Sequence, residues 1–129
     1  MWSRKEPFST GRAIFHRYAQ NLAGLPLTFQ PEQTQTVTNR WLTALVLDRD
    51  CALTPTQLLE HLKAEGIEGR HLWKPMHAQP LFSGSPCVTT GEENVSDDLF
   101  ARGVCLPSDT KMTMEDVDRV CRAIRKVLE

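Results

Sequence analysis

Apolar side chains recur at helical spacing near the start of the chain. Ile14, Tyr18 and Leu22 lie four residues apart and make one apolar stripe, which predicts a helix from about Ser9 to Ala23. A glycine and a proline then end the helical pattern. The next segment, Leu25 to Thr36, holds two prolines and many glutamines, and it predicts an extended connection.

A second helix has the clearest start signal in the sequence. Thr54 can cap its amino end, Pro55 suits the first helical position, and Gln57 completes a capping box. A leucine-rich face follows, and Gly66 ends the helix. The last helix begins in a similar way at Thr113, with an aspartate three residues on, and apolar residues follow the helical period for the rest of the sequence.

The stretch from Trp41 to Leu47 is almost continuously apolar, which predicts a strand covered on both faces. Shorter strands are expected at Ile67 to Leu72 and at Val104 to Leu106, and a short helix is expected from about Ser96 to Arg102. Residues 73–95 are interrupted by prolines and glycines, and a loop of this length is usually functional or mobile. The pattern predicts an α+β domain: about three strands, antiparallel or mixed, covered by three to four helices.

Length and composition fit one globular domain. The chain has 129 residues, of which 40% are apolar and 24% charged, with a net charge of -1. This balance gives no indication of a nucleic-acid or membrane partner, and neither a membrane span nor a secretion signal is present in the sequence, so we expect a cytoplasmic protein. The four cysteines form no CxxC pair. Cys105 and Cys121 are expected to be small core residues.

The sequence lacks the common catalytic motifs. It has no G-x-S-x-G, no P-loop and no G-x-G-x-x-G. His16 and His61 lie on predicted helices and are expected to be exposed to solvent. His71, His77 and Cys87 match no known spacing of metal ligands, so no metal site is predicted.

One segment, Arg70 to His77, is rich in side chains that can bind a ligand. It places two cations, two histidines and a tryptophan in eight residues after a predicted strand. Such groups at a strand end suit an anionic substrate such as a phosphate or carboxylate. Alternatively, it is a surface loop whose Trp73 and Met76 fill a neighbouring groove. Composition alone leaves both interpretations open.

The stretch Arg70 to Phe82 (RHLWKPMHAQPLF) resembles a signature near the C-terminus of sugar-nucleotide aminotransferases of the DegT/StrS type. These are pyridoxal-phosphate enzymes of the aspartate-aminotransferase fold. Three further stretches are similar to the family in the same order. They are Arg12 to Leu25, like the helix that links its two domains; Trp41 to Asp48, like the first strand of its small domain; and Leu99 to Val120, like its closing strand, turn and helix. The resemblance covers about residues 9–129.

The resemblance implies a division of the chain and a missing part. Residues 1–30 would be a linker helix and connection from the large domain, and residues 31–129 the C-terminal small domain. The N-terminal large domain of the family carries the lysine that binds pyridoxal phosphate, the aspartate at the pyridine nitrogen and the phosphate-binding residues, and we expect it to be absent here. None of the lysines lies in a matching context. We therefore expect no catalytic or cofactor-binding residue in this chain, and no activity from it alone.

The resemblance also implies a role for the segment from Arg70 to His77. The small domain would close the active-site cleft, with Arg70 and His77 near the sugar-nucleotide or amino-donor substrate and Lys74 as a weaker third candidate. Trp73 would pack this segment against the large domain. An alternative is a stand-alone module that binds a partner protein or an anion. Because the stripe of Ile14 and the loop 73–95 would lose their cover without the large domain, we also expect a homodimer.

Overall fold

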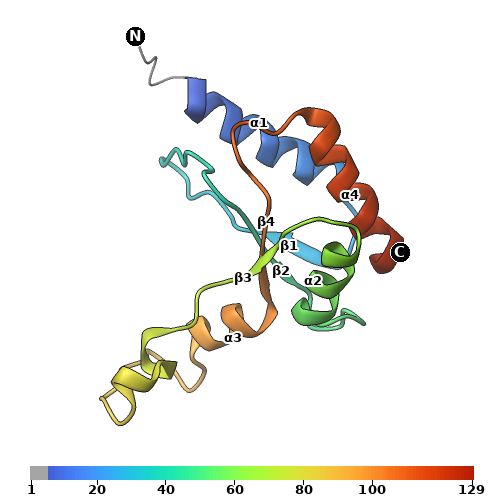
Figure 1. The fold of residues 1–129 in the computed structure, drawn as a ribbon. Coiled ribbons are helices and arrows are strands. Elements are labelled where there is room, and N and C mark those ends of the chain that lie inside the picture. The colour runs from blue at the N-terminus through green and yellow to red at the C-terminus, as the bar shows by residue number, and fades with distance from the viewer. Residues whose placement is uncertain (1–5) are drawn as a thin grey trace.

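The structure is a computed structural model that describes residues 6–129, with side chains from residue 10 onward. It contains four helices and one antiparallel sheet of four strands in the order β1-β2-β4-β3 (Figure 1). The elements in chain order are α1 (Glu6–Asn21), β1 (Leu27–Phe29), β2 (Thr43–Leu47), α2 (Pro55–Ala64), β3 (Arg70–His71), the 3-10 turns η1 (Met76–Ala78) and η2 (Pro80–Phe82), α3 (Val95–Arg102), β4 (Gly103–Leu106) and α4 (Met114–Leu128).

The core lies between the sheet and the helices α1, α2 and α4. Leu45 of β2 pairs with Val104 of β4, so both side chains share one face of the sheet, and both are buried. On the other side of this core α1 and α4 lie side by side (Figure 1). Ile14 and Tyr18 are 0% exposed and Leu22 is 1% exposed. The expectation that this stripe forms an uncovered surface is therefore wrong, because the apolar face of α4 and the sheet already cover it.

The opposite face of the sheet is only partly covered. Along β2 the buried residues alternate with half-buried ones such as Ala44 and Val46. The short helix α3 contacts β2 and β4, and Leu99 on it is 41% exposed. The predicted strand from Trp41 thus begins two residues later, and its second face is less covered than its apolar composition indicated.

Both predicted capping boxes are confirmed. The Thr54 hydroxyl accepts from the backbone N–H of Gln57 at 3.3 Å, and the Gln57 side chain accepts from the backbone N–H of Thr54 at 2.9 Å. Thr113 and Asp116 make the same reciprocal pair at the start of α4. Gly66 ends α2 with φ of 71°, a backbone conformation in which glycine is favoured. These three ends follow from local backbone chemistry, which explains why the sequence located them.

Two predictions about strands need correction. The sheet has four strands where about three were expected, because β1 lies inside the segment predicted as a connection. Leu27 to Phe29 pair with Leu47 to Leu45, and a strand of three residues is too short to show a period in sequence. The predicted strand Ile67 to Leu72 is reduced to Arg70 and His71.

The degree of burial predicted for Cys105, Cys121 and His16 is confirmed, and that predicted for His61 is wrong. Cys105 and Cys121 are buried, and burial raises the pKa of the Cys121 thiol to about 11, which keeps it in the unreactive thiol form. His16 is exposed as expected. His61 is half-buried, against expectation, because it lies one turn after the buried Leu58 on α2.

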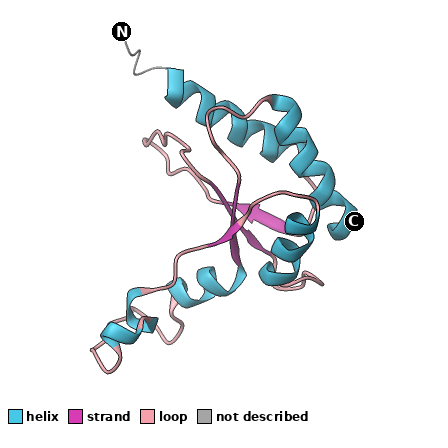
Figure 2. Cartoon of the chain, in the orientation of Figure 1, coloured by secondary structure: helices cyan, strands magenta, loops and turns pink. Residues whose placement is uncertain are grey.

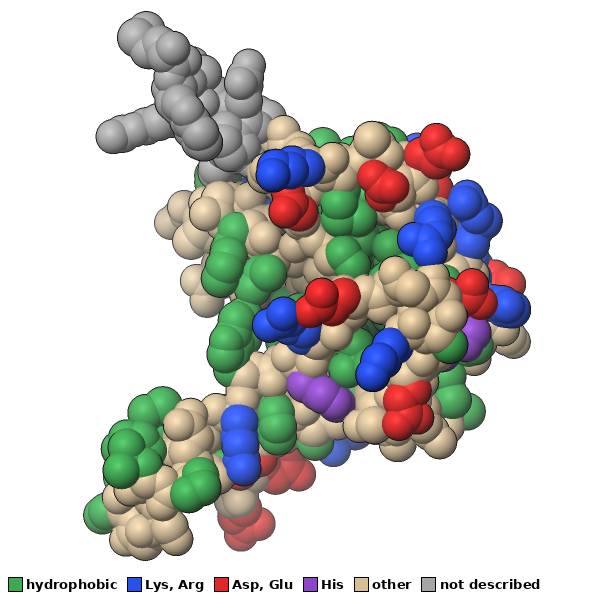
Figure 3. Space-filling model, in the orientation of Figure 1, with side chains coloured by type: hydrophobic (Ala, Val, Ile, Leu, Met, Phe, Trp, Pro, Cys, Tyr) green, Lys and Arg blue, Asp and Glu red, His purple; other side chains and the backbone are tan. Residues whose placement is uncertain are grey.

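Residues 73–94 form an arm that projects away from the body of the domain (Figures 1 and 2). It consists of loops and the turns η1 and η2. Its side chains include the exposed Met76 (60%), Leu81 (84%) and Val88 (94%), and hydrophobic atoms gather at its end in the space-filling view (Figure 3). In the described part of the chain, no helix is both long and apolar enough to cross a membrane.

Candidate functional site

Arg70 lies on β3 at the edge of the sheet, where it pairs with Cys105 of β4. Its guanidinium donates from Nε at 3.1 Å and from Nη2 at 2.7 Å to Oε1 of Glu68. The two side chains are 79% and 75% exposed, and an ion pair in such contact with water contributes little to stability. An anionic ligand can therefore replace Glu68 at small cost.

His77 and Lys74 lie further along the same segment. Nε2 of His77 is 2.8 Å from Oδ1 of Asp97 and 3.4 Å from Nδ2 of Asn94, so the ring ties η1 to the start of α3. Lys74 is exposed, and its carbonyl accepts from the Gln79 side chain. Among the described contacts, no hydrogen bond or ion pair joins Arg70, Lys74 and His77 to one another. The structure places the three predicted residues on one segment and does not bring them together in a closed site.

An open groove of about 580 Å³ lies beside Arg70. Trp41 and Leu106 contribute to its wall from the sheet side, and Arg119 contributes from α4. The Arg119 guanidinium also donates to the carbonyl of Glu65. This volume is in the range of small-molecule sites in proteins, and the groove presents two arginines beside apolar surface.

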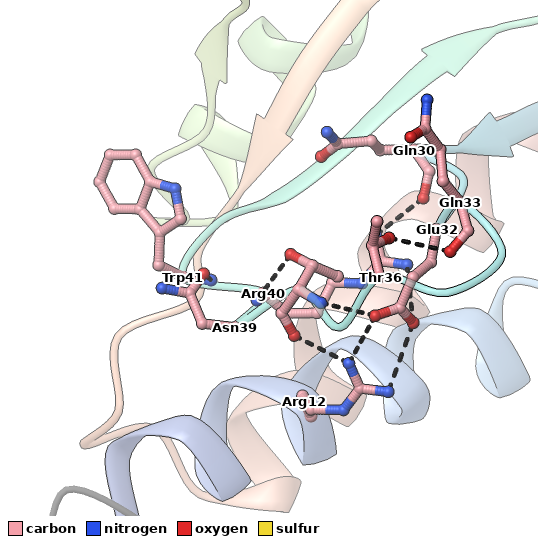
Figure 4. A network of polar contacts seen from close by, with 9 residues as sticks. Arg12, Gln30, Glu32, Gln33, Thr36, Asn39, Arg40 and Trp41 are labelled. Carbon is pink, nitrogen blue, oxygen red and sulfur yellow. Dashed lines mark hydrogen bonds and ion pairs between the residues drawn. The ribbon is translucent and has the colours of Figure 1, made fainter.

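Glu32 is the centre of a polar network that fixes the loop between β1 and β2 (Figure 4). Its carboxylate accepts from Nη1 of Arg12 at 2.9 Å and from the backbone N–H of Thr38 at 2.6 Å. These hydrogen bonds, first of all that of Arg12, lower the pKa of Glu32 to about 2. Arg12 also donates to the Thr38 carbonyl at 2.8 Å. Helix α1 therefore holds the loop through one arginine that contacts it at two points.

Arg40, at the end of this loop, has an unusual environment for a cation. Its side chain is only 6% exposed, lies 3.7 Å from the ring centroid of Phe15 and donates to the carbonyl of Gln30 at 2.8 Å. Burial lowers the pKa of this guanidinium. Its φ of 49° is in the left-handed region, which costs a residue with a side chain about 1–3 kcal/mol. The contacts of the Arg40 side chain with Phe15 and Gln30 offset this cost and hold the backbone that leads to Trp41.

Trp41 lies just outside this network and contacts Trp73 at the base of the arm. The two ring centroids are 6.4 Å apart with an angle of 30° between planes. The residues are 68% and 67% exposed. Sequence reasoning missed this pair because it placed Trp41 in a buried strand, and it missed the network because Arg12, Glu32 and Arg40 share no motif.

The family resemblance raises the question of whether these residues fit pyridoxal phosphate. That group needs a lysine amine, a carboxylate at its pyridine nitrogen and several donors for its phosphate. The four lysines in the described part of the chain are all exposed, at Lys63, Lys74, Lys111 and Lys126. None of these four lies in an enclosed cavity with such a carboxylate and such donors. The described residues therefore do not fit the cofactor by themselves.

His71 and His77, whose spacing matches no known metal site, contact other side chains. Nε2 of His71 is 3.4 Å from the hydroxyl of Thr56, and His77 contacts Asp97. Among the side chains that the structure describes, from residue 10 onward, no group of three histidine, cysteine or acidic residues is arranged to hold a metal ion.

Curated proteins with sequences similar to this chain include an aminotransferase and a synthase of a nucleotide-linked sugar. EpsN of Bacillus subtilis (strain 168), which is named for pyridoxal phosphate-dependent aminotransferase activity, is 44% identical over 117 residues, covering 88% of this chain and 29% of its own length. A GDP-perosamine synthase of Vibrio cholerae is 29% identical over 114 residues, covering 88% of this chain and 30% of its own. The chain therefore spans about 30% of the length of these curated relatives.

Solved structures agree on the fold. DesV of S. venezuelae superposes with a TM-score of 0.81 at 22% identity, over 95% of this chain and 32% of its own. A DegT DnrJ EryC1 StrS aminotransferase from Brucella abortus superposes with a TM-score of 0.77 at 21% identity, over 94% of this chain and 31% of its own. These matches confirm the expected α+β fold. Residues 5–125 match the DegT/DnrJ/EryC1/StrS aminotransferase family, and the chain belongs to that family.

Proposed function

We propose that this chain is the C-terminal small domain of a pyridoxal-phosphate-dependent sugar-nucleotide aminotransferase. In this proposal residues 1–30 lead in from a large domain and residues 31–129 cover the active-site cleft. One observation carries the proposal: the family match extends over residues 5–125, while the chain spans only about 30% of its relatives. The name of the Vibrio cholerae relative, a GDP-perosamine synthase, supports a nucleotide-linked sugar as substrate. The alternative of a stand-alone interaction module is not favoured by these relatives.

Within that enzyme we assign substrate binding to Arg70 and His77, with Lys74 as a weaker candidate. Arg70 offers paired donors to a phosphate or carboxylate once it releases the exposed Glu68. His77 is held through its Nε2 by Asp97 at 2.8 Å, which orients the ring, and we assign to it a hydrogen bond to a separate part of the substrate. In complete family members pyridoxal phosphate supplies the electron sink for transamination. The role of this chain in that enzyme is to hold the substrate and to exclude water from the cleft.

Restoring a complete enzyme tests this assignment. The chain is joined to the large domain of EpsN, its 44% identical relative, and turnover and KM are measured for the chimera. We expect Arg70→Ala and His77→Ala to raise KM or lower turnover by about tenfold or more, the loss expected when a hydrogen bond to a charged group is removed. Arg122→Ala, at an exposed position on α4, is the matched control and should leave both unchanged. If both test variants transaminate as well as the parent chimera, the site assignment is wrong.

We further propose that the chain on its own forms a homodimer through the projecting arm. The buried α1 stripe takes no part in this contact, but the arm exposes Met76, Leu81 and Val88, and such apolar surface favours association. Light scattering over a wide concentration range measures the mass. A double change, Leu81→Ser with Val88→Ser, should shift the protein toward the monomer. A monomeric mass of the parent at every concentration would contradict the proposal.

A further inference from the structure

The strongest unexplained feature of the surface is the contact between Trp41 and Trp73. Each residue is about two-thirds exposed, at 68% and 67%, although a tryptophan normally buries most of its large apolar area. Their centroid separation of 6.4 Å is near the upper end of the range for aromatic pairs. The two rings therefore contact each other loosely and keep much of their area available to a third group.

The backbone at Trp41 is held firmly even though the ring is exposed. Its N–H donates to the Asn39 side chain at 3.2 Å, and its carbonyl accepts from the Ser108 hydroxyl at 3.1 Å. The preceding residue is the buried Arg40 with its positive φ. Figure 4 shows the Trp41 ring pointing away from the network that holds this backbone. A rigid base under an exposed ring is the arrangement of a binding platform, because little freedom is lost when a ligand stacks on it.

The backbone that carries Trp73 is also held in place. Trp73 follows Leu72, whose N–H donates to the carbonyl of Gly103 on β4 at 3.3 Å. Two residues later Pro75 restricts the backbone. The ring thus stands where the sheet ends and the arm begins.

Two exposed cations are associated with the tryptophan pair, one through a shared groove and one through the sequence. Arg70 and Trp41 line the same groove, and Lys74 directly follows Trp73 in sequence. Three carboxylates also line this groove, and each already accepts from a neighbouring donor: Glu68 from the Arg70 guanidinium, Asp109 from the Lys111 N–H and Asp116 from the Thr113 N–H. Of these three carboxylates only Glu68 is paired with a cation among the described residues, and Arg70 and Lys74 are the exposed cations that an incoming anion can contact.

We infer that Trp41 and Trp73 form a stacking platform for the base of a nucleoside diphosphate, with Arg70 and Lys74 receiving its phosphates. Aromatic side chains stack on any nucleobase, and nearby cations bind its phosphates. This inference rests on the proposed function for the identity of the ligand as a nucleotide, and it adds the subsite that holds the base. Substrate binding at His77 is a separate claim and does not depend on it.

Tryptophan fluorescence of the 129-residue chain tests the platform. The chain has three tryptophans, so a Trp2→Phe background leaves emission from the pair alone. This protein is titrated with UDP and with GDP, under excitation at the red edge of the tryptophan band, and affinity is checked by calorimetry. We expect saturable quenching by both nucleotides and none by inorganic pyrophosphate, which carries the phosphates without the base.

Substitutions then separate stacking from general effects on the fold. Trp73→Ala and Trp41→Ala should each weaken nucleotide binding by about tenfold or more, as expected for loss of one base–aromatic stack, whereas Trp73→Phe should keep most of the affinity. Val95→Ala, at an exposed apolar residue at the start of α3, is the control and should bind like the parent. Thermal unfolding is measured for each variant to confirm that it is folded.

Three results would overturn the inference. The first is that neither UDP nor GDP gives saturable quenching. The second is equal nucleotide affinity of Trp73→Ala and the parent. The third is a dimer that binds no nucleotide and that Trp73→Ala dissociates, which would make the pair a protein contact. If the titration fails while the chimera still loses turnover on Arg70→Ala, the platform is wrong and the proposed function stands.

Discussion

Helix α1 packs closely against the loop before Trp41 at Gly11, and this contact yields a sharp prediction. A Cβ atom added at Gly11 would lie 2.8 Å from the carbonyl oxygen of Asn39 and 3.0 Å from that of Arg40. Both contacts are with backbone atoms, which cannot rotate away. Gly11→Ala therefore requires the helix and the loop to separate by a few tenths of an ångström.

Two effects of opposite sign set the size of the change. Replacing glycine by alanine inside a helix stabilises it by about 1 kcal/mol. Forcing an extra carbon into a well-packed contact costs about 1–3 kcal/mol. The steric cost exceeds the gain, so we expect Gly11→Ala to lower the free energy of unfolding by about 1 kcal/mol, which corresponds to about 3–5 °C in Tm for a domain of this size.

Urea unfolding followed by circular dichroism measures this change. Gly91→Ala is the control, because a Cβ there meets no atom within 4 Å and its φ is not positive, and we expect it to be nearly neutral. The displacement should also reach Trp41, so the near-ultraviolet circular dichroism of the tryptophans should change for Gly11→Ala and stay the same for Gly91→Ala. A Gly11→Ala protein that is more stable than the parent by about 1 kcal/mol would show that the contact is looser than the structure indicates, and would refute the reasoning.

Three further measurements follow from the structure. Tyr18→Phe removes the hydrogen bond from the buried hydroxyl to the Pro107 carbonyl at 2.8 Å, and should cost about 1 kcal/mol of stability in urea titration. The pKa of Glu32 is lowered from 4.5 to about 2, so the stability that Glu32 contributes is complete above pH 4.5 and is lost as the pH falls toward 2. Glu32→Gln should therefore reduce the change in the free energy of unfolding between pH 4.5 and pH 2. An unchanged pH dependence would contradict the network. Incubation with pyridoxal phosphate and borohydride should label the exposed lysines without preference for any one of them, because none of those that the structure describes lies in a cofactor cavity, and selective labelling of a single lysine by mass spectrometry would contradict this.

The parts of the fold that the sequence predicted depend on local chemistry. The capping box at Thr54 and the apolar period of the last helix act within a few residues, so they are visible in the sequence. The strand β1 was not visible because its three residues are fixed by pairing with β2 across a loop. The covering of Ile14 by α4 was also not visible, since it joins segments about one hundred residues apart in the chain, as the Arg17–Asp118 ion pair shows.

The candidate site was predictable only in part, for a similar reason. The density of cations, histidines and tryptophan identified the segment from Arg70 to His77 without any knowledge of the fold. The direction of each side chain depends on partners elsewhere: His77 faces Asp97, and Trp73 meets Trp41, which lies 32 positions before it in the chain. No spacing rule connects Trp41 to Trp73, because their contact depends on how β2, β3 and β4 are paired.

The observed pairing of Arg70 with Glu68 does not count against a role for Arg70 in binding. A pair whose side chains are 79% and 75% exposed exchanges readily with water and with other anions. A buried arginine such as Arg40, at 6% exposure, is in the opposite situation, because losing its partners would leave a charge without solvent. The structure thus separates two kinds of arginine that the sequence could not distinguish. Those like Arg40 fix the backbone beneath the tryptophan pair, and those like Arg70 remain free to change partner, as substrate binding requires.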